Sequence, residues 1–176
     1  MKKFILAAAS ALLLMTSCTK EGTALFKGNY SFKTSGTVTA DYTIVTVEED
    51  GTESTSEGTA DFDLAMEQGQ MDILPAGGDD MIITMNILGG EVYTVDAGVS
   101  DNVITVGPFS RKVEVELTDL EKVSVPVTVY GEGRRYEKTV IFDLTLAGSY
   151  SAVIGDTSID LVIVDSSVQC VSKLND

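Results

Sequence analysis

Apolar and polar side chains alternate along most of the chain with a period of two. In residues 60–66 every second side chain, from Ala60 to Met66, is apolar, and Asp61 and Asp63 fall between them. Successive side chains of a β-strand point to opposite faces, so this pattern predicts a strand with one face in the core. The same alternation is found in four further stretches: 30–32, 112–117, 123–129 and 140–146.

Two runs are apolar at almost every position, 81–88 and 159–164, and we expect them to be strands covered on both faces. Turn signals separate the apolar runs. Asp50-Gly51, Gly89-Gly90 and Gly131-Glu132-Gly133 are typical of hairpins, because glycine adopts the positive φ that tight turns require. These signals recur at the short spacing that is expected of consecutive hairpins.

The count of about nine or ten strands, with no amphipathic helix between them, predicts a single all-β domain. We expect an antiparallel up-and-down barrel of about 8–10 strands, because short turns pair each strand with its sequence neighbour and closure removes exposed edges. A two-sheet β-sandwich satisfies the same pattern and is the alternative. Pro126 indicates an edge strand or a bulge, and residues 48–58, rich in Thr, Ser, Glu and Gly, indicate an exposed hairpin end.

The first 17 residues have the composition of a secretion signal. Lys2 and Lys3 precede an apolar run at 4–15, and the small residues Thr16 and Ser17 follow it. The run is about a dozen residues long, whereas a helix that spans a bilayer needs about 20. We therefore expect residues 1–17 to be a cleaved signal peptide.

The signal ends in Met15-Thr16-Ser17-Cys18, which resembles the lipobox of bacterial lipoproteins. The resemblance implies that the thiol of Cys18 carries diacylglycerol and that a further fatty acid, such as palmitate, is attached at the new N-terminus. Residues 18–25 are then a lipidated tether, and 26–176 form the single β domain. The acyl chains provide the membrane anchor, since each buried methylene contributes about 0.8 kcal/mol.

Residues behind the cysteine bear on localisation. Lys20 and Glu21 resemble part of the export signal of surface lipoproteins in Bacteroides-type bacteria. The resemblance implies an outer membrane lipoprotein of the cell envelope that is exposed at the surface. An ordinary polar linker is the alternative.

A second resemblance concerns the start of the domain. Gly28-Asn29-Tyr30, within residues 26–32, is similar to the Gly-x-aromatic element that opens calycin-like and lipocalin-like barrels and closes one end of them, although tyrosine replaces the usual tryptophan. Residues 148–150 repeat the pattern. The whole domain resembles the small calycin-like lipoproteins of Bacteroides-type bacteria, most of which are uncharacterised. A turn glycine followed by a core tyrosine is the alternative reading of the motif.

Composition excludes several functions. After loss of residues 1–17 the chain holds 10 basic and 27 acidic residues, a formal net charge of −17. We therefore expect no nucleic-acid binding, which depends on cationic contacts to phosphate. The chain has no histidine, so Ser-His-Asp and Cys-His sites cannot be built. With Cys18 acylated, Cys170 has no disulfide partner, and we expect it to be a buried structural thiol.

Carboxylates are the remaining catalytic groups. Asp61 and Asp63, and likewise Glu114 and Glu116, alternate with apolar residues and are expected on the solvent face. A general acid needs a desolvated carboxyl group, which neither pair provides. Residues 77–80 (GGDD) are expected to be a turn and not a calcium loop. We therefore predict no catalytic residue, no metal site and no cofactor, and a protein that is not an enzyme.

Two groups of residues are candidates for binding. Arg134, Arg135 and Tyr136 concentrate positive charge after a glycine pair, and they would bind an anion or an acidic partner unless they pair with Glu132 and Glu137. The aromatic residues of the second group would line a barrel cavity for a small apolar ligand, or simply fill the core: Tyr30, Phe32, Tyr42 and Phe62.

Two functions without enzymatic activity follow from these candidates. The first is a lipid-anchored interaction domain that docks on another cell-envelope protein, and the sequence favours it because no ligand group is identifiable. The alternative is a carrier of a small apolar ligand in a barrel cavity. In both, the membrane is a partner through the N-terminal lipid.

Overall fold

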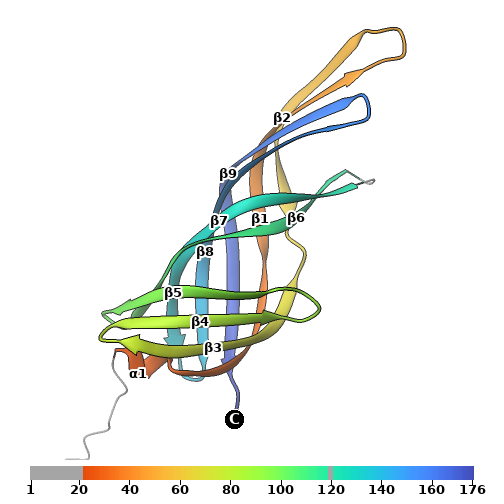
Figure 1. Ribbon diagram of the computed structural model, residues 1–176. Helices are drawn as coiled ribbons and strands as arrows, with labels where there is room; N and C mark the ends of the chain where they lie inside the picture. Colours follow the sequence, from red (N-terminus) through yellow and green to blue (C-terminus); the bar gives the residue numbers. More distant parts are fainter. Residues whose placement is uncertain (1–21, 119–120) are drawn as a thin grey trace, which may run out of the picture.

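A computed structural model describes residues 22–118 and 121–176, and within them the protein is almost entirely β-structure (Figure 1). The described part contains one short helix and nine strands: α1 (Thr23–Phe26), β1 (Gly28–Val47), β2 (Glu53–Asp63), β3 (Glu67–Gly77), β4 (Asp80–Ile87), β5 (Val92–Ser100), β6 (Val103–Thr118), β7 (Glu121–Tyr136), β8 (Thr139–Ile154) and β9 (Thr157–Leu174). The predicted all-β class and strand number are confirmed.

All strand pairs are antiparallel, and the sheet closes into a ring. From β3 to β9 each strand pairs with its sequence neighbour, and β9 returns to pair with β1 from Tyr30 to Thr46. The predicted up-and-down barrel is therefore confirmed, and the two-sheet sandwich is not formed. Closure leaves most strands without a free edge, as the short connections require.

Strand β1 is long enough to have two partners along one edge. Residues 28–34 pair with β3, and residues 37–47 pair with β2. The closed ring therefore consists of β1 and β3–β9, and β2 lies beyond it. In Figure 1 the β1–β2 and β8–β9 hairpins extend together past the barrel as an arm.

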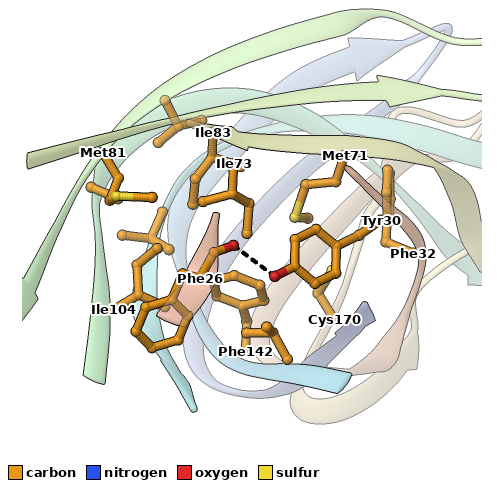
Figure 2. Close-up of a cluster of buried hydrophobic side chains, with 14 of the residues drawn as sticks. Phe26, Tyr30, Phe32, Met71, Ile73, Met81, Ile83, Ile104, Phe142 and Cys170 are labelled. Atoms are coloured by element: carbon orange, nitrogen blue, oxygen red, sulfur yellow. Dashed lines mark hydrogen bonds between the residues drawn. The ribbon is translucent and has the colours of Figure 1, made fainter. Parts of the chain in front are cut away.

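Two clusters of buried side chains fill the interior. The lower cluster surrounds Tyr30, Met71 and Phe142 and is closed from below by α1 (Figure 2). Phe26 of α1 is fully buried there, and its carbonyl oxygen accepts a hydrogen bond of 2.6 Å from the Tyr30 hydroxyl. The upper cluster surrounds Val38, Phe62 and the inward valines of β7, including Val125.

The predicted strand faces are only partly correct. Val123–Val129 and Val140–Leu146 point every second side chain inward, as expected. The expectation that 81–88 and 159–164 are covered on both faces is wrong, because Ile82 and Val164 are 37% and 54% exposed. A single-layer barrel has nothing to cover its outer face.

The alternation predicted for 60–66 also ends early. Phe62 is buried and Ala60 and Leu64 are half-buried, but β2 stops at Asp63 and Met66 is exposed. The chain needs these residues to step from β2 to β3 along the edge of β1, so the strand geometry is not continued.

The turn predictions are mostly confirmed. Gly51 and Gly89 adopt φ values of 83° and 75° in their hairpins, and residues 77–80 form the β3–β4 turn. The exposed hairpin end at 48–58 is also present. Pro126 lies where β7 pairs with β6 but not yet with β8, so it occupies a local edge, as predicted.

The glycine pair at 131–133 is not a turn, which corrects that prediction. Both glycines lie inside β7. Glycine is required at these positions because neither has room for a side chain. A Cβ on Gly133 would lie 2.6 Å from Cδ1 of Phe142, and one on Gly131 would meet the carbonyl oxygen of Asp143. The real turn follows at Glu137, whose φ is 55°.

The ends of the described chain bear on the predicted tether and leader. Leu25, at the end of the segment assigned to a tether, lies in α1 and packs against the lower cluster. Gly28 begins β1, whereas residues 148–150 lie inside β8. The signal segment and Cys18 lie outside the described residues. Over 22–118 and 121–176, no helix has the length and apolar composition needed to cross a bilayer.

Candidate functional site

A half-open cleft of about 540 Å³ enters the side of the barrel between the two core clusters. Its walls come from residues 64–68, 87–91 and 111–114, and its floor includes Leu146 and Val168. Pockets for small molecules occupy roughly 300–1,000 Å³ and combine apolar walls with a few polar groups. The cleft has a volume in this range, and its lining combines apolar side chains with charged ones from all three wall segments.

The strand pairing explains why the barrel opens here. β5 pairs with β6 only as far as Val106, and the β6–β7 register shifts between Val106 and Phe109. Pro108 within this shift has no N–H to continue a ladder. Beyond it, β6 faces the end of β2, and among the described residues a single bridge, Leu64–Val115, joins the two sides. We call this discontinuity the seam.

An ion pair lies at the inner end of the cleft. Arg111 of β6 occupies the same strand face as Phe109 and Val113, and Glu67 begins β3 on the same face as Met71. Nη2 of Arg111 donates to Oε1 of Glu67. The Arg111 side chain is 10% exposed and that of Glu67 25%, so the pair is largely removed from water. Charged side chains are rarely buried to this degree without a partner.

Tyr93 of β5 forms the aromatic side of the site. The guanidinium carbon of Arg111 lies 5.3 Å from the centroid of its ring, within the range of a cation–π interaction. The ring also meets that of Phe109, with centroids 6.3 Å apart. Burial raises the pKa of Tyr93, and so does the 2.7 Å hydrogen bond that its hydroxyl donates to Oε2 of Glu91. Tyr93 is therefore neutral at physiological pH.

Arg111 is not saturated by these contacts. Its Nε is buried and donates no hydrogen bond to any described residue. A guanidinium presents five N–H donors in a planar fork, and a buried donor without an acceptor costs about 1–3 kcal/mol. The site thus holds a donor that the rest of the described chain leaves unused.

A smaller inner chamber lies behind the ion pair. Its volume is about 30 Å³, and its walls are mainly apolar, with Phe32, Met71 and Phe142 among them. Arg111 and Glu67 line both spaces, so the ion pair separates the chamber from the cleft. The chamber is about the size of one or two water molecules and cannot hold an organic ligand by itself.

Cys170 also lines the inner chamber. It is 2% exposed, which confirms the predicted burial of this thiol, and it is a free cysteine among the described residues. Burial raises its pKa, since the thiolate would lose its hydration. The thiol is therefore protonated and unreactive in the folded protein.

The structure does not gather the four predicted aromatic residues at one site. Tyr30 and Phe32 belong to the lower cluster and Phe62 to the upper one. Tyr42 lies half-buried in the arm, beside Gly58. Of the four, Phe32 lines the inner chamber, and none lines the cleft.

Arg134, Arg135 and Tyr136 lie together at the end of β7 but do not point the same way. Arg135 donates to the carbonyl oxygens of Leu25 and Glu137, so its guanidinium binds its own chain. Arg134 is exposed, with Nη2 3.9 Å from Oε2 of Glu132, and Tyr136 is 57% exposed. The three residues therefore form no common anion site.

The carboxylate pairs lie where the alternation placed them. Asp61, Asp63 and Glu114 are exposed, and the Thr39 hydroxyl donates to Asp61 at 2.7 Å. The side chain of Glu116 lies outside the described residues. In the part of the chain that the structure describes, no three or more His, Cys, Asp or Glu side chains come close enough to hold a metal ion.

The residues that form the site were missed at the sequence level, although each carries a signal. Arg111 precedes Val113 by two positions, which places a charge in the inward phase of a strand. Glu67 and Tyr93 are likewise in phase with the buried Met71 and Val95. A polar residue at an inward position of a β-strand marks either a hydrogen-bonded network or a site.

The chain matches no protein-family model, and a search of curated proteins found no relative.

Proposed function

We propose that this protein is a lipid-anchored binding domain of the cell envelope that holds a small, partly apolar ligand in the side cleft without chemical conversion. The observation that carries the proposal is the cleft of about 540 Å³, whose lining is both apolar and polar and which has one ion pair at its inner end. Its volume and its concavity favour a small molecule that has both apolar and polar parts.

The cleft is a better basis for binding than the surface at the end of β7. Docking on an envelope protein through Arg134, Arg135 and Tyr136 needs their side chains to be available together. Arg135 is bound to two carbonyl oxygens of its own chain. Arg134 is exposed, and an exposed ion pair between it and an acidic partner would contribute at most about 1 kcal/mol to docking.

The lipid anchor explains how such a domain is held at the membrane. Cys18 precedes the first residue of α1 by five positions, and five residues span at most about 18 Å. α1 closes the lower end of the barrel, opposite the arm (Figure 1). The closed end is thus tethered near the bilayer, and the cleft faces sideways.

A fluorescent apolar ester tests binding in the cleft. The chain from residue 18 onward, with Cys18→Ser so that neither lipid nor detergent competes for the probe, is titrated with methyl 1-pyrenebutyrate. We expect saturable binding with one site per chain. Leu146→Trp fills the cleft floor and is expected to weaken binding about tenfold or more, whereas Val164→Trp on the outer face of β9 leaves it unchanged.

Equal binding to both tryptophan variants would place the probe elsewhere and refute the cleft as the site. Circular dichroism shows whether each variant keeps its β-structure. The anchor is tested separately by labelling growing cells with a clickable palmitate. Wild-type protein is expected to carry the label and Cys18→Ser to lose it, and an unlabelled wild type would overturn the anchor.

A further inference from the structure

The donors of Arg111 are the least satisfied polar groups at the inner end of the cleft. One amino group donates to Glu67, the guanidinium carbon lies 5.3 Å from the centroid of the Tyr93 ring, and Nε donates no hydrogen bond to any described residue. Nε and Nη2, the amino group that already donates to Glu67, form one edge of the guanidinium fork. That edge matches the two oxygens of a carboxylate at parallel N–H···O geometry.

We infer that Arg111 recognises a carboxylate, and that the ligand of the cleft is an amphipathic organic acid whose apolar body lies along Tyr93 and the cleft floor. The inference rests on the proposed binding function and names the chemical class of the ligand. The acid group supplies the acceptor that Nε lacks, and the ion pair with Glu67 is shared or displaced on binding.

The burial of the charged groups favours an anion over a cation. A cation would have to pair with Glu67, whose charge Arg111 already neutralises. The guanidinium, with only 10% of its side chain exposed, would then lose its counter-ion in a largely buried site. Glu91, Lys112 and Glu114 at the rim are exposed, so water screens them. The buried guanidinium therefore dominates recognition.

The two cavities set the shape of the ligand. The inner chamber of about 30 Å³ cannot accept a tail, so the apolar body lies on the solvent side of Arg111. There the cleft offers about 540 Å³ bounded by Ile87, Leu146 and Val168. A compact ring system with a short acidic arm fits this space better than a long extended chain.

A matched pair of probes isolates the contribution of the carboxylate. 1-Pyrenebutyrate and its methyl ester share the apolar body and differ in charge, and both are titrated into the Cys18→Ser chain. A hydrogen-bonded charge pair changes affinity by roughly 10-fold to 100-fold. We expect the acid to bind at least about tenfold more tightly than the ester.

Three variants assign that preference. Arg111→Gln is expected to abolish it by weakening acid binding while ester binding changes less than about twofold. Glu67→Gln removes the competing carboxylate and is expected to tighten acid binding alone. Arg134→Gln, at an exposed position outside the cleft, is the matched control and leaves the preference intact.

A spectroscopic readout keeps the test independent of variant stability. The chain contains three arginines, so their Nε–H resonances in a ¹⁵N spectrum are few and can be assigned. The acid is expected to shift the Arg111 resonance, whereas the ester does not. This holds even if Arg111→Gln fails to fold.

Several results would overturn the inference and leave the proposed function standing. Equal affinity for acid and ester in the wild type is one. A second such result is a preference for the acid that is absent in the wild type and present in Glu67→Gln, because it shows that the second oxygen of Glu67 accepts from Nε in solution. Equal weakening of both probes by Arg111→Gln would make Arg111 a wall of the cleft. Absence of binding by either probe overturns the proposed function as well.

Discussion

Replacing both members of the Arg111–Glu67 pair with methionine is expected to leave the protein about as stable as the wild type. Burying two charges costs hydration that their mutual attraction only partly returns, and apolar residues of similar volume often replace such pairs without loss. The surroundings suit methionine, since Met71, Phe109 and Leu144 are close by and the side chain is adaptable.

The single replacements are expected to differ from the double one and from each other. Glu67→Met leaves the guanidinium, 10% exposed, without its anion, and we expect a loss of about 2 kcal/mol. Arg111→Met leaves a carboxylate that is 25% exposed and still partly hydrated, so about 1 kcal/mol is expected. These values are below the 3–5 kcal/mol of a fully buried pair because the cleft admits water. The implied coupling energy is about 3 kcal/mol.

Urea denaturation followed by circular dichroism at pH 7 measures these differences, with comparable slopes as the test that the unfolded state is unchanged. Lys138 and Asp176 form an exposed pair whose methionine cycle serves as the control, with a coupling of at most about 1 kcal/mol. A double variant that loses more than about 2 kcal/mol would show that Arg111 and Glu67 are retained for stability. The argument from this pair to a ligand would then fail.

Three further predictions concern the barrel itself. Gly133→Ala is expected to lose about 1–3 kcal/mol because its Cβ would meet the Phe142 ring, whereas Gly98→Ala, with open space around it, changes stability by less than about 1 kcal/mol in the same urea assay. Burial raises the pKa of Tyr30 above 10.0, so the contribution of its neutral hydroxyl to stability is complete below that pH and is lost as the pH rises through the raised value. Tyr30→Phe is expected to lose about 1–3 kcal/mol of unfolding free energy at pH 7. In a series of unfolding measurements at increasing pH, its unfolding free energy is expected to fall less steeply above about pH 10 than that of the wild type. In the Cys18→Ser chain, Cys170 is expected to react with a thiol reagent only after unfolding, and rapid reaction of folded protein would contradict its burial.

Local alternation was sufficient to predict most of the fold. Val123–Val129 and Val140–Leu146 each show one inward face, and the tight turns at Gly51 and Gly89 follow from the φ that glycine permits. The prediction for 81–88 and 159–164 is wrong because apolar content alone does not show that both faces of a strand are covered. Whether an outward valine or isoleucine is covered depends on a second layer, and a barrel wall has none.

The glycine pair in β7 shows a second limit of local reasoning. The local sequence predicts a turn at Gly131 and Gly133, but these glycines are required by neighbours that lie about ten residues away in β8. Glycine is used where the backbone needs a positive φ and also where a neighbouring chain approaches too closely for a side chain. Only the first use can be recognised from adjacent residues. The partner strand decides between the two.

The candidate site was less predictable than the fold because its residues meet through register. Arg111 and Glu67 are 44 positions apart, and their contact depends on the shift between Val106 and Phe109. The inward phase of Arg111 was visible in the alternation, but its counter-ion was not. The sequence predicts aromatic residues such as Tyr30 as ligand-binding residues, but alternation places such residues in a core whether or not a ligand is bound.

The two successive partners of β1 account for both the seam and the candidate site. Because β1 pairs first with β3 and then with β2, the chain must leave its ladder between Asp63 and Glu67, and there it meets β6 through the isolated Leu64–Val115 bridge and not through a continuous ladder. A seam of this kind exposes backbone and apolar side chains, which natural barrels avoid. Here it is edged by three inward polar residues from separate strands, Glu67, Tyr93 and Arg111. Closure alone would be served by apolar side chains at those positions, so the three inward polar residues at this seam are the structural basis of the proposed ligand site.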